Sequence, residues 1–325
     1  MRRSILLAGL AILALLPGTG TAADNPPRAI ATVGMIADVA RNVAGDCVQV
    51  DALMGPGVDP HLYEAKSSDV RKLRAADAIL YAGYSLEGQL GNVLERLGAD
   101  KPAVAVSPAS IDTGELISVQ DLYGIDPHVW MDVSLWSKIA PTIADTLAGI
   151  VPDCAAAMER RAAAYREQLA ALHQWVADSI ATIPEQQRVL VTAHDAFGYY
   201  GRAYGIDVKG VQGISTDSEA GIRDIQRMVE LTIERDVPAV FIESTINPRT
   251  VQAVIDGAAA KGHEVTIGGE LYSDAMGNEG TADGTYIGML RANTMAIVDA
   301  LGGTTAPWPA ALADWAERWE QNEDA

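Results

Sequence analysis

The stretch PDCAAAMERRAAAYREQLAALHQWVADSIATIP, residues 152–184, has the clearest helical pattern in the chain. Between its two prolines there is no Gly or Pro, and apolar side chains recur at three- and four-residue steps. The members of this stripe are Met158, Ala162, Tyr165, Leu169, Leu172, Val176, Ile180 and Ile183. The spacing predicts one amphipathic helix over 153–183, with Asp153 as its N-cap. At 1.5 Å per residue it is a rod of about 45 Å, which can hold two lobes in a fixed relation. A long helix inside one domain fits the same pattern.

Strand-like and helix-like segments alternate on both sides of this helix. The expected strands are 29–33, 48–53, 78–81 and 103–106, then 188–192, 208–212, 239–242 and 264–267. The expected helices include a stretch ending near 44, 68–75, 86–97 and 133–150, then 197–204, 219–236, 250–261 and 285–301. This alternation predicts an α/β fold of two lobes, each a four-stranded parallel sheet flanked by helices, joined by one long backbone α-helix. The expected lobes are residues 24–152 and 184–325, with 153–183 as the linking helix.

The N-terminal segment predicts a secretory signal peptide over residues 1–23. Arg2 and Arg3 precede an apolar run, 5–16, and small residues follow up to Ala23. The apolar run is too short to span a bilayer, although an N-terminal anchor or a buried helix remains an alternative. No cysteine follows the run, so no lipid-attachment site is visible. We therefore expect a mature protein that is free and soluble outside the cytoplasm and not lipid-anchored.

Charge excludes two classes of partner. Removing residues 1–23 takes away two arginines and no acid, which leaves 22 basic against 43 acidic residues and a net charge of −21. Such a surface argues against nucleic acid and against anionic membranes as partners, and it is compatible with a cationic ligand. Past the N-terminal segment, no apolar run approaches the 18 residues that a transmembrane helix needs.

The two cysteines, Cys47 and Cys154, leave one question open. In an oxidising compartment they can form a disulfide, but nothing in the sequence places them close together. Neither belongs to a C-x-x-C pair, which weighs against thiolate ligation of a metal.

The triplet Asp-Pro-His occurs twice, as Asp59-Pro60-His61 and Asp126-Pro127-His128, in a chain with only five histidines. Proline fixes one backbone dihedral and pushes the preceding Asp into an extended conformation. Each triplet is therefore a stiff turn that presents one imidazole, the commonest metal-ligating side chain. Two such turns far apart in sequence suggest a site assembled between two parts of the fold.

Two further donors follow expected strands of the second half. His194 lies in Thr192-Ala193-His194-Asp195, and Asp274 lies in Leu271-Tyr272-Ser273-Asp274. Ligands of open parallel sheets bind beyond the carboxyl ends of the strands. His61, His128, His194 and Asp274 form a nitrogen and oxygen set suited to Zn²⁺ or Mn²⁺. With two donors from each half, the metal would lie between the lobes.

The other candidates fit simpler roles. His173, beside the helical stripe, and His263, on a turn, are expected to be exposed or locally hydrogen-bonded. Glu243, at the end of an expected strand, either orients a ligand histidine or is a solvated acid.

Enzyme signatures are poor, since H-E-x-x-H, G-x-S-x-G, G-x-G-x-x-G after the first strand and a Walker loop are all missing. Two rival functions remain. In a secreted metal-dependent hydrolase, His194-Asp195 or Glu243 would act as a base beside a metal-bound water. Against it, four protein ligands leave no open coordination position. A structural adhesin or scaffold would bind no metal stoichiometrically.

These motifs together resemble a known family. The segments 59–64, 126–132, 192–197, 241–244 and 268–274 are similar, in order and spacing, to those of the metal-binding solute receptors of manganese and zinc ABC importers, the TroA-like and ZnuA-like proteins of cluster A-I. The resemblance covers nearly all of the chain after the signal peptide. It implies two α/β lobes joined by a backbone helix, with the metal held between them by His61, His128, His194 and Asp274.

The resemblance also implies a partner and a role. The protein would bind a divalent metal, Mn²⁺ or Zn²⁺, in the periplasm, perform no bond-making chemistry, and deliver the ion to a membrane permease. We separately expect a monomer, although the sequence leaves the oligomeric state open. His194 at the third ligand position is similar to TroA-like and zinc-uptake members, whereas many manganese receptors of Gram-positive bacteria have glutamate there. The chain has no histidine between His61 and His128, so it lacks the His-rich loop of many zinc-uptake members. Mn²⁺, Zn²⁺ and Fe²⁺ stay undecided.

Overall fold

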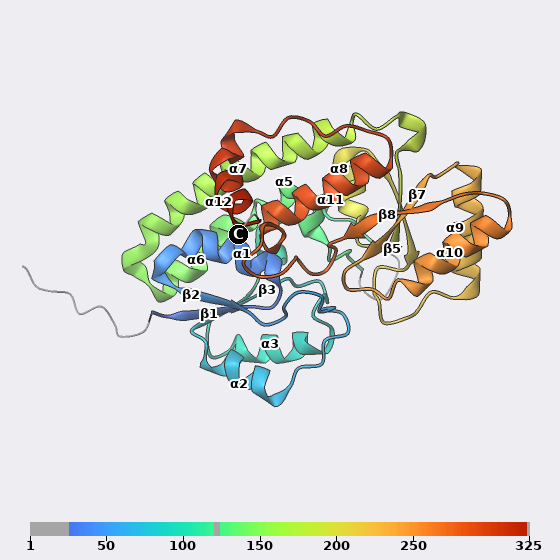
Figure 1. The fold of residues 1–325 in the computed structure, drawn as a ribbon. Coiled ribbons are helices and arrows are strands. Elements are labelled where there is room, and N and C mark those ends of the chain that lie inside the picture. Colours follow the sequence, from blue (N-terminus) through green and yellow to red (C-terminus); the bar gives the residue numbers. More distant parts are fainter. Residues whose placement is uncertain (1–25, 120–123, 324–325) are drawn as a thin grey trace, which may run out of the picture.

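The computed structural model describes residues 26–119 and 124–323, with side chains up to 319. The predicted signal peptide, 1–23, lies outside the described residues. Two lobes lie side by side, and a single long helix runs along both of them (Figure 1). We call the lobe that contains the first four strands the N-lobe and the lobe that contains the last four the C-lobe.

The N-lobe has the predicted four-stranded parallel sheet. Its strands are β1 (Arg28–Ala31), β2 (Gln49–Ala52), β3 (Ala78–Tyr81) and β4 (Ala103–Ala105). They pair in the order β2-β1-β3-β4, and every pairing is parallel. The helices are α1 (Gly34–Ala44), α2 (Ser67–Ala75), α3 (Gly91–Leu97), α4 (Val106–Ser110), α5 (Val133–Trp136) and α6 (Ile139–Ile150). Helices α1 and α6 cover one face of the sheet, and α2 and α3 cover the other (Figure 1).

The C-lobe has the four expected strands, but the expectation of one four-stranded sheet is wrong in detail. The strands are β5 (Val189–His194), β6 (Asp207–Gln212), β7 (Ala239–Glu243) and β8 (Thr266–Leu271). They form two parallel two-stranded ladders, β5-β6 and β7-β8, and β5 lies against β7. Where the two ladders meet, the backbone N–H of His194 donates to the Glu243 carboxylate rather than to a β7 carbonyl. A side chain therefore replaces a backbone pairing at this point.

The C-lobe helices cover both sides of these strands. They are α8 (Gly198–Tyr204), α9 (Ile222–Glu234), α10 (Arg249–Ala260) and α11 (Tyr286–Ala300), and α12 (Ala313–Glu323) follows near the C-terminal end. Helices α9 and α10 pack side by side on the outer face, away from the N-lobe (Figure 1).

The predicted linking helix is α7 (Ala155–Ile180), which is slightly shorter than expected. All eight stripe residues are buried, so the apolar periodicity identified the packed face correctly. The expectation that Asp153 caps the helix is wrong. Residues Pro152–Cys154 form a 3₁₀ turn, and Cys154 occupies the N-cap position without a side-chain cap hydrogen bond.

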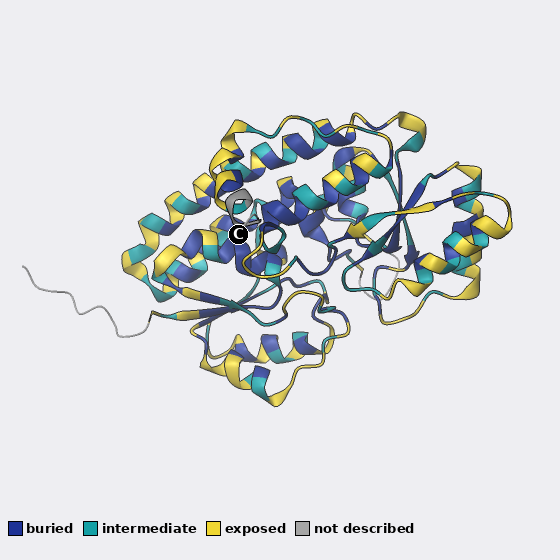
Figure 2. Cartoon of the chain, viewed as in Figure 1, coloured by how far each residue is buried: buried dark blue, intermediate teal, exposed yellow. Residues whose placement is uncertain are grey.

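One core joins the lobes. A single cluster of buried apolar residues includes the N-lobe sheet, α1, α6, α7 and α11, whereas smaller clusters fill the outer part of the C-lobe and the α2-α3 face. Figure 2 shows this buried face continuing from α1 and α6 onto α7 and α11. Because close-packed interiors resist deformation, we expect α7 to oppose large opening of the lobes.

Proline explains one departure from the predicted helices. The expected helix 133–150 is divided into α5 and α6, with a turn at Ser137 and Lys138. Pro141 lies in the first turn of α6, where its missing N–H is tolerated. In a continuous helix its ring would clash with the carbonyl of Ser137, so the helix restarts.

The structure resolves the question of the cysteines. Cys47 and Cys154 form a disulfide with their Cα atoms 6.4 Å apart. The bond joins the 3₁₀ turn after α1 to the turn before α7, and thereby ties the N-lobe to the start of the linking helix.

Among the described residues, no helix has both the length and the apolar character needed to cross a membrane.

Candidate metal centre

His61, His128, His194 and Asp274 come together between the lobes. Each is buried, and each offers one donor atom that lies within 4.8 Å of the other three. The His128 Nε2 lies 3.2 Å from the His61 Nε2 and 3.3 Å from the Asp274 Oδ1. The Asp274 Oδ2 lies 3.3 Å from the His194 Nε2 and 3.7 Å from the His61 Nε2. Four donors from different parts of the chain thus surround one point.

These separations fit a four-coordinate dication. Donor atoms about 2.1 Å from a tetrahedral zinc ion lie about 3.4 Å from one another. Moreover, the His194 Nε2 and both Asp274 carboxylate oxygens are buried and make no hydrogen bond of good geometry within the described residues, while their close polar neighbours include the other donors of the set. Buried polar atoms are costly unless they are well paired, and a bound dication would pair all three atoms at once. The donor set can therefore hold a divalent metal.

Both Asp-Pro-His triplets adopt the same local turn. In each, the Asp side chain accepts a hydrogen bond from the backbone N–H of the His, at 2.8 Å for Asp59 and His61 and 3.0 Å for Asp126 and His128. Asp side chains commonly bond to the backbone two residues on, and the intervening proline keeps the Asp extended. The stiff turn inferred from the sequence is present twice.

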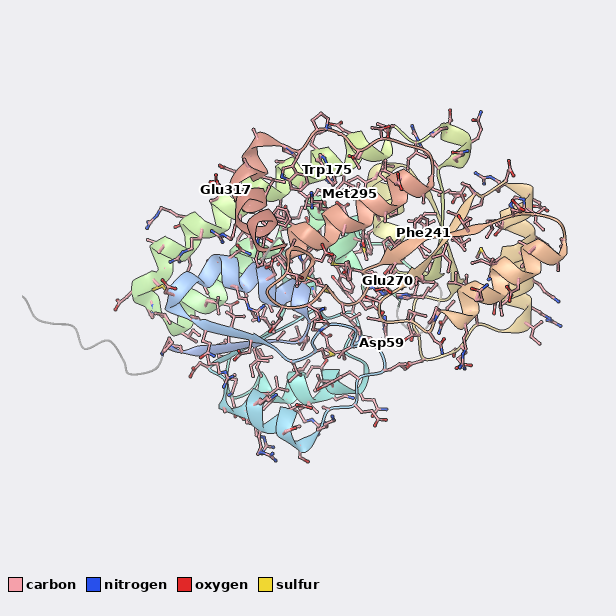
Figure 3. All side chains as sticks on the ribbon, in the orientation of Figure 1. Asp59, Trp175, Phe241, Glu270, Met295 and Glu317 are labelled. Carbon is pink, nitrogen blue, oxygen red and sulfur yellow. A yellow bond between two sulfur atoms is a disulfide. The ribbon has the colours of Figure 1, made fainter. Side chains whose placement is uncertain are left out.

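The two aspartates of these triplets differ in the additional hydrogen bond that each side chain makes. The Asp126 Oδ1 also lies 2.8 Å from the His128 Nδ1, so it orients the ring. The Asp59 Oδ2 instead accepts from the Thr216 hydroxyl in the C-lobe, at 2.6 Å. Asp59 is labelled in Figure 3, on the N-lobe loop that faces the C-lobe. Asp126 therefore orients the His128 ring, whereas Asp59 connects the N-lobe to the C-lobe through Thr216.

Glu243 orients His194, which is the first of the two alternatives for this acid. It is 3% exposed, so it is not a solvated strand-end residue. Its Oε2 lies 2.5 Å from the His194 Nδ1, and its Oε1 accepts from the His194 backbone N–H at 2.8 Å. A carboxylate on the second ring nitrogen fixes the ring so that Nε2 faces the other three donors, at the candidate metal position.

The segment that carries Asp274 is held from both sides. Asn293 on α11 bonds to both backbone groups of Tyr272, and the Gly277 N–H donates to the Asp283 carbonyl at 2.8 Å. Between these points, the indole Nε1 of Trp130 donates to the Ser273 carbonyl at 2.9 Å. Asp274 is consequently presented at the end of β8 by contacts from both lobes.

Without metal, the pKa values of the three histidines and of Asp274 are shifted in different directions. Burial lowers the pKa of His61 to about 3. Burial also acts to lower the pKa of His128, but Asp126 and Asp274 outweigh it and raise that pKa to about 9. Against the same burial effect, Glu243 and Asp274 raise the pKa of His194 well above its usual value. Although burial opposes it, the charges of His194 and His128 hold the pKa of Asp274 well below its usual range. Without metal, these shifts favour positive charge on the His128 and His194 rings, beside the Asp274 carboxylate.

Sequence reasoning missed two residues that shape the centre. Asp126 orients the His128 ring, and the signal was its position two residues before a candidate ligand. Trp130 had no signal, because its contact with Ser273 depends on how the lobes meet. The other histidines lie elsewhere: the His173 Nδ1 bonds to the Tyr204 hydroxyl at 3.1 Å, and His263 lies on the turn before β8. Both match the local roles expected for them.

Comparison with known proteins agrees with this geometry. The family model described as "Zinc-uptake complex component A periplasmic" matches residues 30–300. The "Manganese-binding lipoprotein MntA" of Bacillus subtilis is 46% identical over 306 residues, which cover 93% of this chain and 100% of that protein. The "Zinc-binding protein TroA" of Treponema pallidum is 46% identical over 280 residues, which cover 86% of this chain and 90% of that protein.

The fold agrees as well. The solved structure of the periplasmic zinc-binding protein TroA from Treponema pallidum superimposes with a TM-score of 0.83, covering 85% of this chain and 99% of that chain. A second TroA structure, 35% identical, gives a TM-score of 0.80. The chain therefore belongs to the ZnuA family of metal-binding substrate-binding proteins of ABC transporters.

Proposed function

We propose that this protein captures one Zn²⁺ or Mn²⁺ between its lobes, with His61, His128, His194 and Asp274 as ligands, and delivers it to the membrane permease of an ABC importer. The observation that carries the proposal is the convergence of four buried donor atoms within 4.8 Å. The metal is cargo, so the site must both bind and release it. The proposal divides the chain into lobes 24–152 and 184–325 joined by the helix 153–183.

The ligands alone do not select one metal, so the ion that is carried also depends on which metal is available to the protein. Two relatives of equal identity are named for different metals, MntA for manganese and TroA for zinc. Three imidazoles and a carboxylate accept either ion, and zinc binds such sets more tightly than manganese in vitro. We propose that the same four residues bind both ions and that metal availability decides which one is carried.

We further propose that the receptor works as a free monomer in the periplasm. Both cysteines of the sequence are joined in the Cys47–Cys154 disulfide, so neither thiol is available for a lipid. In this it would differ from relatives named lipoproteins, such as MntA. All four donors come from one chain, so no second subunit is needed to complete the site.

Metal titration of chelator-stripped protein tests the ligand assignment. Wild type should bind one equivalent of Zn²⁺ and, in a separate titration, one of Mn²⁺. His61→Ala, His128→Ala, His194→Ala and Asp274→Ala should each weaken binding at least about 100-fold, because each removes one of four ligands. His263→Ala is the control, since His263 lies outside the site. Retained affinity in the four variants would refute the assignment.

The hydrolase alternative is not supported. The family consists of substrate-binding proteins, and the four proposed ligands would complete a tetrahedron and leave no open position for an attacking water.

A further inference from the structure

We propose that Trp130 is a positioning residue that holds Asp274 against His128 across the two lobes and thereby sets the rate of metal release. This inference rests on the proposed metal-binding function. It assigns the indole N–H a role in the rate of metal release, whereas the four donor atoms bind the metal.

The contact crosses the boundary between the lobes. Trp130 follows His128 by two residues in a 3₁₀ turn of the N-lobe, Val129–Met131, and its side chain is 0% exposed. Its Nε1–H donates to the backbone carbonyl of Ser273 at 2.9 Å. Ser273 immediately precedes Asp274 in the C-lobe. One side chain thus connects the segments that carry two ligands from opposite lobes.

The indole is itself held in place. Its ring packs edge-on against the His128 imidazole, with centroids 5.3 Å apart, and against Trp136 at 6.2 Å. Its backbone carbonyl accepts from the Tyr286 hydroxyl at 2.6 Å. The indole is therefore held by neighbours besides the Ser273 carbonyl.

Tyr286 extends this connection to the linking helix. Its backbone N–H donates to the Asp38 Oδ2 at 3.2 Å, and the same oxygen accepts from the Tyr165 hydroxyl on α7 at 3.0 Å. Asp38 lies on α1, so α1, α7 and α11 meet at one buried carboxylate. The Asp274 segment is anchored through Trp130 to the rigid part of the molecule.

The Trp130–Ser273 hydrogen bond should affect the rate of metal release more than the rate of metal binding. Moving Asp274 away from His128, whose Nε2 is 3.3 Å from the Asp274 Oδ1, requires the buried Ser273 carbonyl to lose its indole donor. Breaking a buried hydrogen bond without replacement slows such a motion by about tenfold. Without the donor, the segment should open more often and the metal should leave faster.

The test compares Trp130→Phe with Trp136→Phe. Trp136 is a matched control, because it is also 0% exposed, belongs to the same ring stack, and its Nε1 has no hydrogen-bond partner within the described residues. Full-length mature protein is loaded with Zn²⁺, and transfer of the ion to an excess of a chromophoric chelator is followed by stopped flow. Association of Zn²⁺ with the stripped protein is measured separately.

We expect Trp130→Phe to release Zn²⁺ about tenfold faster than wild type and Trp136→Phe, with association rates within about twofold of wild type. Hydrogen exchange of the metal-free proteins should show lost protection over residues 271–277 in Trp130→Phe alone. Equal release rates in the two variants would overturn the inference. Failure of wild type to bind one Zn²⁺ would instead refute the proposed function.

A second variant covers the case in which Trp130→Phe does not fold. Tyr286→Phe keeps the ring and removes the hydroxyl that fixes the Trp130 carbonyl. Faster Zn²⁺ release from Tyr286→Phe than from Trp136→Phe supports the inference, and an unchanged rate contradicts it.

Discussion

Glu243 binds His194 twice: one carboxylate oxygen accepts from the backbone N–H at 2.8 Å, and the other lies 2.5 Å from the Nδ1. The pair joins the ends of β5 and β7, where a backbone ladder is missing. The same contact that connects the two ladders of the C-lobe therefore also aims the His194 Nε2 at the candidate metal position. The Glu243 carboxylate thus contributes both to the packing of β5 against β7 and to the orientation of the His194 ring.

Glu243→Gln should weaken Zn²⁺ affinity by about 10- to 100-fold, because an amide presents one acceptor and would direct its NH₂ group at the other donor. Competition with a chelator of known affinity measures the change. Glu270→Gln is the control, since Glu270 is an exposed acid on the neighbouring strand β8 (Figure 3). Equal affinities in both variants would show that Glu243 does not support the ligand.

Metal binding should release about two protons near pH 7. The pKa of His128 is raised to about 9 and that of His194 well above its usual value, whereas His61 is already neutral. Both charged rings must lose a proton before they can bind a cation, so affinity should rise about 100-fold per pH unit around neutrality. Calorimetry in buffers of different ionisation enthalpy counts the protons. Release of fewer than one proton per Zn²⁺ would contradict this electrostatic account.

Without metal, stability should fall as the pH rises from about 6.5 to about 9. The pKa of His128 is higher in the folded state than in the unfolded chain, so its interaction with Asp126 and Asp274 stabilises fully below pH 6.5 and is lost through pH 9. The loss should reach up to about 3 kcal/mol. Urea unfolding of chelator-treated protein at the two pH values measures it. His128→Gln should show a smaller fall, and an equal fall would assign the effect to other groups.

Replacing both cysteines, as Cys47→Ser with Cys154→Ser, should lower the free energy of unfolding by about 5 kcal/mol. The disulfide closes a loop with a sequence separation of 107, and loop entropy in the unfolded chain sets this magnitude. Urea unfolding of the metal-free protein tests the value. Zn²⁺ affinity should stay within about threefold, because the bond lies between α1 and α7 rather than at the site. A large loss of affinity would mean that the disulfide positions the lobes.

The strands, the linking helix and the four donor residues were accessible from sequence because each has a local signal. Apolar runs located the strands to within a few residues, the stripe from Met158 to Ile183 located α7, and proline marked both stiff turns. Such signals depend on nearest neighbours in the chain, which the sequence shows directly.

What the sequence could not supply depends on residues that are distant in the chain. The division of the C-lobe strands into two ladders, the Cys47–Cys154 bond and the Trp130–Ser273 contact each join segments separated by long stretches. The raised pKa of His128 depends on Asp126, which is near in the chain, and also on Asp274, which comes from the other lobe. For the same reason, ordinary imidazole chemistry predicts loss of affinity only below about pH 6.5, whereas the assembled site extends the pH dependence higher.

X-ray absorption of the Zn²⁺-loaded protein shows whether the four proposed ligands hold the ion. We expect four light-atom donors at about 2.0–2.1 Å, with multiple scattering from three imidazoles, and loss of one imidazole contribution in His194→Ala. A spectrum dominated by water and carboxylate oxygens, or one left unchanged by His194→Ala, would show that the metal binds elsewhere.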